Sequence, residues 1–362
     1  MTDAGTTGTG TTGAVRTRRW QAGRVVAEGF DLAEVSDCLA DPDGMVWVDL
    51  VDPDHDLLTR LADEIGLADQ AVEDVVASRE RPKATRSPGH LLFVVYATCL
   101  DAQEATASTS RLRVAKISAF LLPRGLITVR ASEDFDMDEV VRRWDADPEL
   151  LTAGPAALLH GLLDTVVDGH FDTVQQLDDA IEALEDGLFD GEPLSRATQE
   201  RSFRVRKELV ELRRVVLPMR EVVGAVQRHR AEWRSHGDSA HRAQHAADEH
   251  GEEYVSDELD AWFADLFDHV LRVTEWTESL RDMVTTVFET NLALADARLN
   301  TIMKKLTGWA AIVAVPTAIT GWFGMNVPYP GFSRQLGLWL ATGAILGVSG
   351  TLYAVFRRKD WI

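Results

Sequence analysis

The chain has few cysteines, and its first residues lack the apolar segment of a secretory leader. Cys38 and Cys99 stand alone, so they form no metal-binding or redox spacing, and a reduced cytoplasmic compartment is the default. Residues Met1 to Thr12 are rich in Thr and Gly and have no apolar h-region. We therefore expect a disordered tail here rather than a signal peptide.

Positive charge is also scarce. The chain has 37 Lys and Arg against 58 Asp and Glu, which gives a formal net charge of −21 at pH 7. This balance argues against nucleic acid as a partner and favours the attraction of cations, although a well-solvated surface would carry the same charge. The sequence contains no nucleotide-binding loop, and no nucleophile–base pair or catalytic metal spacing stands out. These absences argue against an enzyme.

Charge of either sign is missing from two long apolar runs near the C-terminus. These runs extend from Leu306 to Phe323 and from Leu336 to Phe356. A helix needs about 20 apolar residues to cross a bilayer, so both runs qualify as transmembrane spans. The tripeptide Gly324-Met325-Asn326 follows the first run. The sequence therefore predicts a membrane hairpin with a Gly-Met-Asn turn at its far tip.

The residues that flank the two runs predict the orientation of this hairpin. Lys304-Lys305 precede the first run and Arg357-Arg358-Lys359 follow the second, whereas the connecting loop carries only Arg334. Lys and Arg concentrate on the cytoplasmic side of membrane proteins. We therefore expect both termini in the cytoplasm, the loop outside, and a location in the cytoplasmic (inner) membrane.

The residues before the hairpin predict a small α/β domain followed by long helices. Residues 45–50 alternate and are β-branched, which is typical of a strand, and Asp52-Pro53 and Gly66 are a helix start and stop. Further strands are predicted at 90–100, 112–122 and 125–130, and helices at about 54–65, 71–78, 156–188 and 194–227.

The predicted organisation has seven parts. They are a disordered tail (1–19), a cytoplasmic α/β domain (20–150), a helical hairpin with a His-rich connector (151–255), a stalk helix that continues into transmembrane helix 1 (256–325, with its apolar part at about 306–325), an external loop (326–335), transmembrane helix 2 (336–356) and a basic cytoplasmic tail (357–362).

The connector between the helices is unusually rich in histidine. It contains His229, His236, His241, His245 and His250. His241 and His245 could share one face of a helix and hold a metal ion. The alternative is a solvated connector, because no Cys or clustered acid completes a set of ligands.

A helix from Asp257 to Phe323 is predicted, since the first Gly or Pro in this stretch is Gly308. At 1.5 Å per residue it would be about 100 Å long, and it would need other helices to pack against. Steps of four and three along it pick out a polar stripe: Glu275, Ser279, Asp282, Thr286, Glu289, Ala293, Asp296, Asn300, Met303, Thr307, Ala310, Ala314, Thr317 and Gly321.

A coiled coil would place apolar residues at the spacing of this polar stripe. Instead, the apolar contacts fall on a neighbouring stripe, which consists of Leu292, Leu299, Ile302, Leu306 and Trp309. Several copies of the helix around an axis would therefore enclose a polar channel, with acidic rings such as Glu289 and Asp296 at its cytoplasmic end. Before residue 300 the stripe could instead face solvent. Within the membrane, Thr307 and Thr317 gain most by facing water or another helix.

Taken together, these residues resemble the CorA family of magnesium channels. The Gly-Met-Asn tripeptide at the outer end of the first of two C-terminal spans carries the resemblance, which extends from about residue 20 onward. Other segments similar to the family are Val48-Asp-Leu-Val-Asp-Pro53, Val72-Glu-Asp-Val75, Arg81-Pro-Lys83, Trp262-Phe-Ala-Asp-Leu-Phe-Asp-His269, Asn300, Met303, Leu306, Pro316-Thr317 and Arg357-Arg-Lys-Asp-Trp361.

The resemblance implies a homopentameric funnel in a lipid membrane. Its subunits would each provide an α/β/α sandwich, a long stalk helix that becomes the pore-lining first span, and a peripheral second span. Asn326 would form a ring of amide oxygens that binds hydrated Mg²⁺, next to the close turn at Gly324. Asn300 would form a polar ring at the inner mouth, and Met303 and Leu306 a hydrophobic gate. The implied pore lining is Asn300, Met303, Leu306, Thr307, Ala310, Ala314, Thr317 and Gly321.

The resemblance also implies regulation by Mg²⁺ inside the cell. Asp265, with Asp268 beside it, would bind Mg²⁺ between subunits and hold the channel closed, and loss of the ion would let the carboxylates repel one another. The chain departs from the family pattern at two places. Ala314 stands where the family has a pore Met, and the external loop has Arg334 but no acidic residue.

Three hypotheses remain open from the sequence. The first is a Mg²⁺ channel, for which Mg²⁺ is both the transported and the regulatory ion and Co²⁺ is a possible second ion. The second is a related transporter of Co²⁺, Ni²⁺ or Zn²⁺, which the His-rich connector favours and the intact Gly-Met-Asn disfavours. The third is a membrane-anchored coiled-coil scaffold without transport, which the polar stripe disfavours.

Overall fold

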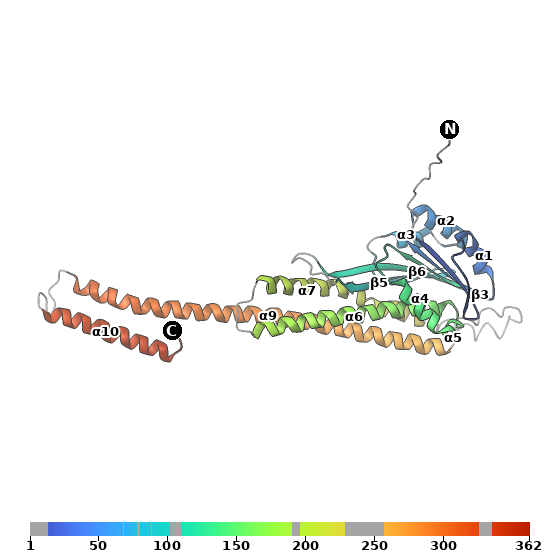
Figure 1. Cartoon of the computed structure of the whole chain (residues 1–362). Coiled ribbons are helices and arrows are strands. Elements are labelled where there is room, and N and C mark those ends of the chain that lie inside the picture. The colour runs from blue at the N-terminus through green and yellow to red at the C-terminus, as the bar shows by residue number, and fades with distance from the viewer. Residues whose placement is uncertain are drawn as a thin grey trace, which may run out of the picture. The chain divides into compact units, whose positions relative to one another are not determined.

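The structure of the chain is a computed structural model (Figure 1). It describes residues 14–67, 69–77, 80–87, 89–101, 110–189, 196–228, 257–325 and 335–362. The chain divides into two compact units, Met1–Val284 and Thr285–Ile362.

The first unit is built on a seven-stranded sheet. Its strands are β1 (Val15–Gln21), β2 (Arg24–Glu28), β3 (Gly44–Val51), β4 (Lys83–Ser87), β5 (His90–Leu100), β6 (Leu112–Leu122) and β7 (Gly125–Arg130). Their order in the sheet is β2-β1-β3-β7-β6-β5-β4. Strands β3 and β7 are parallel neighbours, and the other neighbouring pairs are antiparallel. The sheet is therefore mixed.

Helices cover both faces of this sheet and make an α/β/α sandwich (Figure 1). The labelled helices of the whole chain are η1 (Leu32–Glu34), α1 (Val35–Ala40), α2 (His55–Ile65), α3 (Asp69–Val76), α4 (Met137–Ala146), α5 (Pro148–Leu151), α6 (Pro155–Phe189), α7 (Arg196–Val216), α9 (Asp257–Phe323) and α10 (Gln335–Arg358). Helix α10 and the end of α9 belong to the second unit. Helices α1, α2 and α3 lie on one face, and α4 and α6 lie on the other (Figure 1). The core between the sheet and this second layer includes apolar side chains of α9 such as Phe263 and Val270.

Several elements follow the sequence pattern closely. Helix α2 begins where the Asp54 carboxylate accepts a hydrogen bond from the backbone N–H of Leu57 (2.7 Å), and it ends at Gly66 with φ of 72°. Both are standard helix caps. The predicted continuous helix from Asp257 to Phe323 is confirmed as α9.

Two sequence predictions need correction. Strand β1 begins at Val15, inside the range 1–19 that was predicted to be a disordered tail, because Val15–Gln21 pairs with both β2 and β3. The helix predicted over 194–227 is two helices. Helix α7 ends at Val216, a turn follows at Leu217-Pro218, and a second helix covers 219–228. The break occurs because Pro218 has no backbone N–H to donate and its ring clashes with the preceding turn.

A buried ion pair joins the two parallel strands. Asp49 on β3 is fully buried, and its carboxylate accepts hydrogen bonds from the Arg130 guanidinium on β7 at 2.6 and 3.1 Å. The same carboxylate accepts from the Thr128 hydroxyl (2.7 Å), which in turn accepts from the Trp47 indole (3.1 Å). Arg130 also donates to the carbonyl oxygen of Phe135 (3.0 Å). The network thereby fixes the segment that leads into α4.

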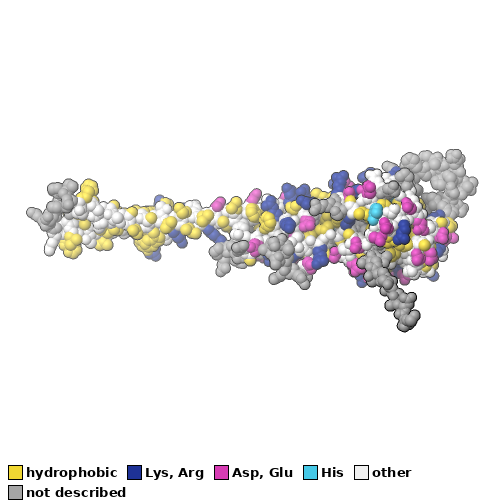
Figure 2. Space-filling view, turned by 90° about the horizontal axis from the view of Figure 1, so that it is seen from above, with side chains coloured by type: hydrophobic (Ala, Val, Ile, Leu, Met, Phe, Trp, Pro, Cys, Tyr) yellow, Lys and Arg dark blue, Asp and Glu magenta, His cyan; other side chains and the backbone are white. Residues whose placement is uncertain are grey.

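The second unit consists of the C-terminal part of α9 and helix α10. Both helices are long and apolar enough to cross a membrane. Figure 2 shows hydrophobic side chains over these helices, whereas charged side chains of both signs cover the α/β/α sandwich. Helix α9 contains Pro316 within its apolar stretch, so the carbonyl of Ile312 loses its usual intrahelical partner.

Loss of the buried carboxylate charge should destabilise the sandwich strongly. The substitution Asp49→Asn leaves the buried Arg130 guanidinium without a counter-charge, which we expect to cost about 3–5 kcal/mol in the free energy of unfolding. The matched control is Asp145→Asn, which removes an exposed partner of Arg18 and should cost less than about 1 kcal/mol. Chemical unfolding of the solubilised protein measures both, and equal losses would contradict a structural role for the Asp49–Arg130 pair.

Candidate functional site

The polar stripe predicted on α9 lies opposite the face by which the helix packs in the first unit. The buried side of α9 follows steps of four and three through Leu259, Phe263, Leu266, Val270, Val273, Thr277, Leu280 and Val284. At 100° per residue, Glu275 and Asp282 point about 140–160° away from Thr277. Both are exposed. Packing within the chain therefore leaves the acidic part of the stripe uncovered.

The same separation of faces holds in the second unit. Gly308 is buried, and a Cβ placed on it would lie 3.2 Å from a side-chain carbon of Ile362 and 3.7 Å from Phe356. The half-buried residues of α9 continue from Gly308 on that face, which packs against α10 and the residues after it. Thr317 lies about 180° away from Gly308 and is exposed. Helix α10 therefore covers one side of α9 and leaves the polar stripe on the other.

The hydroxyl groups along this part of α9 are oriented by their own helix. Thr317 donates to the carbonyl of Val313 (3.2 Å), and Thr320 donates to the carbonyl of Pro316 (2.8 Å). A hydroxyl that donates in this way keeps its oxygen lone pairs free to accept. On the stripe, Thr317 therefore presents an acceptor, which is suited to the water shell of a cation.

The predicted turn begins immediately after α9. Gly324 donates its N–H to the carbonyl of Thr320 (2.9 Å), and Met325 donates to Trp322 (3.3 Å). A Cβ on Gly324 would lie 3.0 Å from the Thr320 oxygen, so a larger residue would crowd the turn. Asn326 and Arg334 lie outside the described residues, and so do all five histidines of the connector.

The two aspartates predicted to be regulatory lie one turn apart on α9. The Asp265 side chain is 69% exposed, and its carboxylate lies 3.7 Å from the nearer nitrogen of His269, which is too far for a hydrogen bond. Asp268 is exposed and continues the line of the polar stripe, seven residues before Glu275. Within one chain both carboxylates are exposed and could bind a ligand from solvent or from a neighbouring chain.

His160 on α6, a residue that the sequence reasoning missed, fixes the start of α9. Its Nε2 lies 3.2 Å from the carbonyl oxygen of Trp262, and its ring contacts Trp262 and Phe263 edge-on. Burial lowers the pKa of His160, although Asp164 and Asp265 oppose this effect. The neutral imidazole therefore sets the position of the turn that carries Asp265. Its only sequence signal is a single His in an apolar helical stretch.

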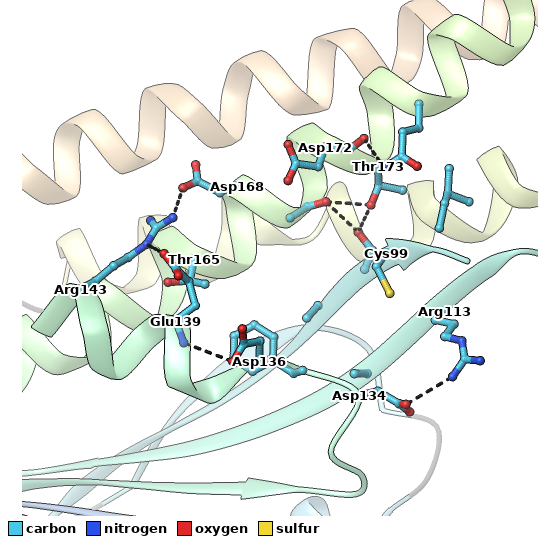
Figure 3. Close-up of a pocket in the computed structure, with 17 residues that line it drawn as sticks. Cys99, Arg113, Asp134, Asp136, Glu139, Arg143, Thr165, Asp168, Asp172 and Thr173 are labelled. Carbon is cyan, nitrogen blue, oxygen red and sulfur yellow. Dashed lines mark hydrogen bonds and ion pairs between the residues drawn. The ribbon is translucent and has the colours of Figure 1, made fainter. Parts of the chain in front are cut away.

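A second site that the sequence did not reveal is an acidic cavity of about 480 Å³ between the sheet and α6 (Figure 3). Its walls come from β5, β6, α4 and α6. The charged residues that line it are Asp134, Asp136, Glu139, Asp168, Asp172, Arg113 and Arg143. The sequence contains no local signal for this cavity, because its walls are up to 79 residues apart between Ala97 and Gln176.

Arginines hold several of the cavity's carboxylates. Arg143 bonds to Asp168 at 2.7 Å and to Glu139 at 3.2 Å (Figure 3). It also bonds to Asp164, next to the cavity, at 2.7 Å. Burial opposes the charge of Arg143, but its hydrogen bonds to Asp168 and Glu139 outweigh burial and raise its pKa. Burial also raises the pKa of the neighbouring Cys99 thiol, which keeps it protonated. In the part of the chain that the structure describes, no three His, Cys, Asp or Glu residues lie close enough to hold a metal ion.

The fold and the stripe together define a class. The chain combines an α/β/α sandwich, a long helix that continues into an apolar hairpin, and a polar face that the hairpin partner does not cover. These are features of an oligomeric membrane transport protein rather than of an enzyme or a single-span anchor.

Comparison with known proteins identifies the family. The model of the family described as CorA-like Mg²⁺ transporter protein matches residues 42–358. The cobalt/magnesium transport protein CorA of Thermotoga maritima is 24% identical over 309 residues, which are 85% of this chain and 80% of that protein. The protein of the same name from Methanocaldococcus jannaschii is 22% identical over 321 residues, which are 88% of this chain and 92% of that protein.

A solved structure agrees with the fold. The complete CorA magnesium transporter of M. jannaschii superposes with a TM-score of 0.69 at 20% sequence identity, and the match covers 96% of this chain and 98% of that one. The chain therefore belongs to the CorA-like Mg²⁺ transporter family. This is a family of divalent-cation transporters, not a class of enzymes.

Exposure of the polar stripe to water in the membrane can be measured. In a background with Cys38→Ser and Cys99→Ser, we expect Ala314→Cys to react with a charged, water-soluble thiol reagent. The control Ile312→Cys lies on the side of α10 and should react at least about tenfold more slowly, because a thiol in apolar surroundings ionises poorly. Equal rates in reconstituted protein would contradict the separation of the two faces.

Proposed function

We propose that this protein is a homopentameric channel that carries Mg²⁺ into the cell across the cytoplasmic membrane. The observation that carries the proposal is the polar stripe of α9, which faces away from both the packed sandwich and α10. A single hairpin cannot enclose a pore. Polar side chains in a membrane helix gain most when they line water or meet other helices. A ring of subunits with the stripes turned inward meets this requirement, and α10 then lies outside.

Asn326 acts as the selectivity ring at the outer mouth in this proposal. Mg²⁺ gives up its water reluctantly, so side-chain amide oxygens suit it by accepting hydrogen bonds from bound water. Support comes from the turn at Gly324, where a Cβ would crowd the Thr320 carbonyl, and from the acceptor character of Thr317 one level inward.

The remaining stripe residues divide the conduit into zones. Asn300 forms the inner polar ring, and Met303 and Leu306 form a hydrophobic constriction that gates by dewetting. Thr307, Ala310, Ala314, Thr317 and Gly321 line the membrane part, and Glu289 and Asp296 form acidic rings that concentrate cations below it. Small residues at 310, 314 and 321 leave width for a hydrated ion.

Gating follows from the acidic residues of the first unit. Asp265 and Asp268 bind Mg²⁺ between neighbouring subunits and favour the closed state, and their repulsion after loss of the ion loosens the stalk. Both termini lie in the cytoplasm in this proposal. A divalent ion that moves into the cell gains roughly 4.6 kcal/mol of free energy per 100 mV of membrane potential, twice the value for a single charge. The membrane potential alone therefore drives uptake.

Co²⁺ is the second ion to consider, because the T. maritima relative is named a cobalt/magnesium transport protein. A preference for Co²⁺, Ni²⁺ or Zn²⁺ over Mg²⁺ is the alternative function. A scaffold without transport would need an apolar seam where the polar stripe lies. Flux of Mg²⁺, Co²⁺, Ni²⁺ and Zn²⁺ into proteoliposomes, compared side by side, decides among these functions.

The amide of Asn326 should be essential for Mg²⁺ flux. We expect Asn326→Ala to abolish uptake in a Mg²⁺-dependent strain and in proteoliposomes, while the oligomer still assembles. Asn291→Ala is the matched control, because it removes an amide from α9 away from the polar stripe and should leave uptake normal. Normal uptake by Asn326→Ala would remove Asn326 from the selectivity ring.

Asp265 should couple internal Mg²⁺ to the state of the stalk. We expect Mg²⁺ to protect α9 of the unaltered protein from protease, and Asp265→Ala to need a higher Mg²⁺ concentration for the same protection. Asp56→Ala on α2 removes an exposed carboxylate elsewhere and should change nothing. If Asp265→Ala keeps the protection curve of the unaltered protein, the residue is not a sensor.

A further inference from the structure

Helices α6 and α7 carry opposite charges. The 35 residues of α6 contain eight Asp and Glu and no Lys or Arg, whereas the 21 residues of α7 contain seven Lys and Arg and three Asp and Glu. This segregation contrasts with the chain as a whole, which is strongly acidic. It places a positive helix beside a negative one.

Three exposed carboxylates of α6 that lie outside the acidic cavity form one stripe, which we call the acidic stripe. Its members are Asp179, Glu182 and Asp186, all exposed. At 100° per residue they fall within an arc of about 60°. The buried residues Leu177, Ile181 and Leu184 lie on the opposite side of the helix. The acidic stripe therefore points away from the side by which α6 packs in its own chain.

Helix α7 has a matching stripe, which we call the cationic stripe. Its members are Phe203, Lys207, Val210 and Arg214, spaced by four, three and four residues. Phe203 is 66% exposed and Val210 is 46% exposed, which is unusual for apolar side chains on a packed helix. The buried residues of α7, such as Val205 and Leu212, lie on the opposite side.

The two stripes do not neutralise each other within one chain. Helices α6 and α7 pack side by side through their apolar faces (Figure 1), so both stripes face outward. Among the described residues, Lys207 and Arg214 form no ion pair, and neither do Glu182 and Asp186. Each stripe could therefore form ion pairs with a surface of the opposite charge on another molecule.

We propose that the cationic stripe of α7 in one subunit docks on the acidic stripe of α6 in the next subunit. The occupant is a second copy of this chain, because the chain itself supplies both complementary surfaces. A contact between two different patches of the same subunit is heterologous, and it closes into a ring when the rotation fits. Phe203 and Val210 provide the apolar centre of the contact, and the charges provide its rim and its direction. The inference rests on the proposed ring-shaped channel and names a contact that holds the ring together.

Charge reversal tests the contact without knowledge of its exact register. Lys207→Glu with Arg214→Glu reverses the cationic stripe, and Asp179→Lys with Asp186→Lys reverses the acidic stripe. Either double variant places like charges across the contact, and all four substitutions together restore opposite charges. We expect each double variant to raise about tenfold the concentration at which the solubilised full-length protein is half assembled, and the fourfold variant to recover. The effect should shrink in high salt.

One control variant and three contrary outcomes complete the test of the contact. Arg24→Glu with Arg81→Glu changes the net charge of the chain equally at two exposed sites outside α6 and α7 and should not alter assembly. Unchanged assembly in both double variants, or no recovery in the fourfold variant, overturns the proposal. Unchanged assembly together with weaker binding of Lys207→Glu/Arg214→Glu to anionic phosphatidylglycerol vesicles assigns the cationic stripe to lipid instead, and also overturns it. Assembly is measured without added divalent cations, so a channel that fails to carry Mg²⁺ yet assembles as expected refutes only the proposed function.

Discussion

The structure depends on one constraint: helix α9 has an apolar side that packs against protein and a polar side that needs water or other protein. One side of α9 is apolar and is buried as far as Val287, and from Gly308 onward it is partly covered by α10 and the residues after it, whereas Leu292, Leu299 and Ile302 in between are exposed. The opposite side is acidic, hydroxylated or small over the same length. Polar side chains in a bilayer are stable only when they face water or other protein. In the channel that we propose, further copies of the chain and the water of the pore provide this environment for the polar side.

Side chains of the sandwich fix the position of the N-terminal part of α9 as far as Glu278. His160 contacts Trp262 and Phe263, and the Trp276 indole donates to Asp178 of α6 at 3.2 Å. Arg213 of α7 donates to Glu278 at 2.5 Å. These contacts come from both helices of the α6–α7 pair. They join α6 and α7 directly to α9 within one chain.

Much of this arrangement could be predicted from the sequence, because it depends on local periodicity. The length of α9, the apolar hairpin and the strands β3, β5, β6 and β7 follow from runs of apolar residues and from caps such as Gly66. Strands β1, β2 and β4 were missed because each has few buried residues, and β2 and β4 are in addition short edge strands. The break at Pro218 was missed because the apolar pattern continues on both sides of it.

The candidate site likewise has one part that local periodicity predicts and another part that depends on tertiary contacts. The polar stripe of α9 has a period of three and four residues, so the sequence shows it directly. The acidic cavity and the Arg143 ion pairs join residues that are about 20 or more positions apart, and no local pattern carries that information. His160 has a role only through the tertiary contact with α9. Burial and exposure of whole helix faces likewise require the packing partner to be known.

Pro316 gives α9 uneven stiffness. From Asp257 to Thr307 the helix contains neither Gly nor Pro, so its backbone hydrogen-bond ladder is complete and resists bending. At Pro316 one hydrogen bond of the ladder is missing, and helices bend most easily at such positions. Helix α9 is therefore stiff before Thr307 and bends most easily at Pro316, close to its C-terminal end at Phe323. A bend at Pro316 would change the direction of residues 317–323 and leave the helix before it straight.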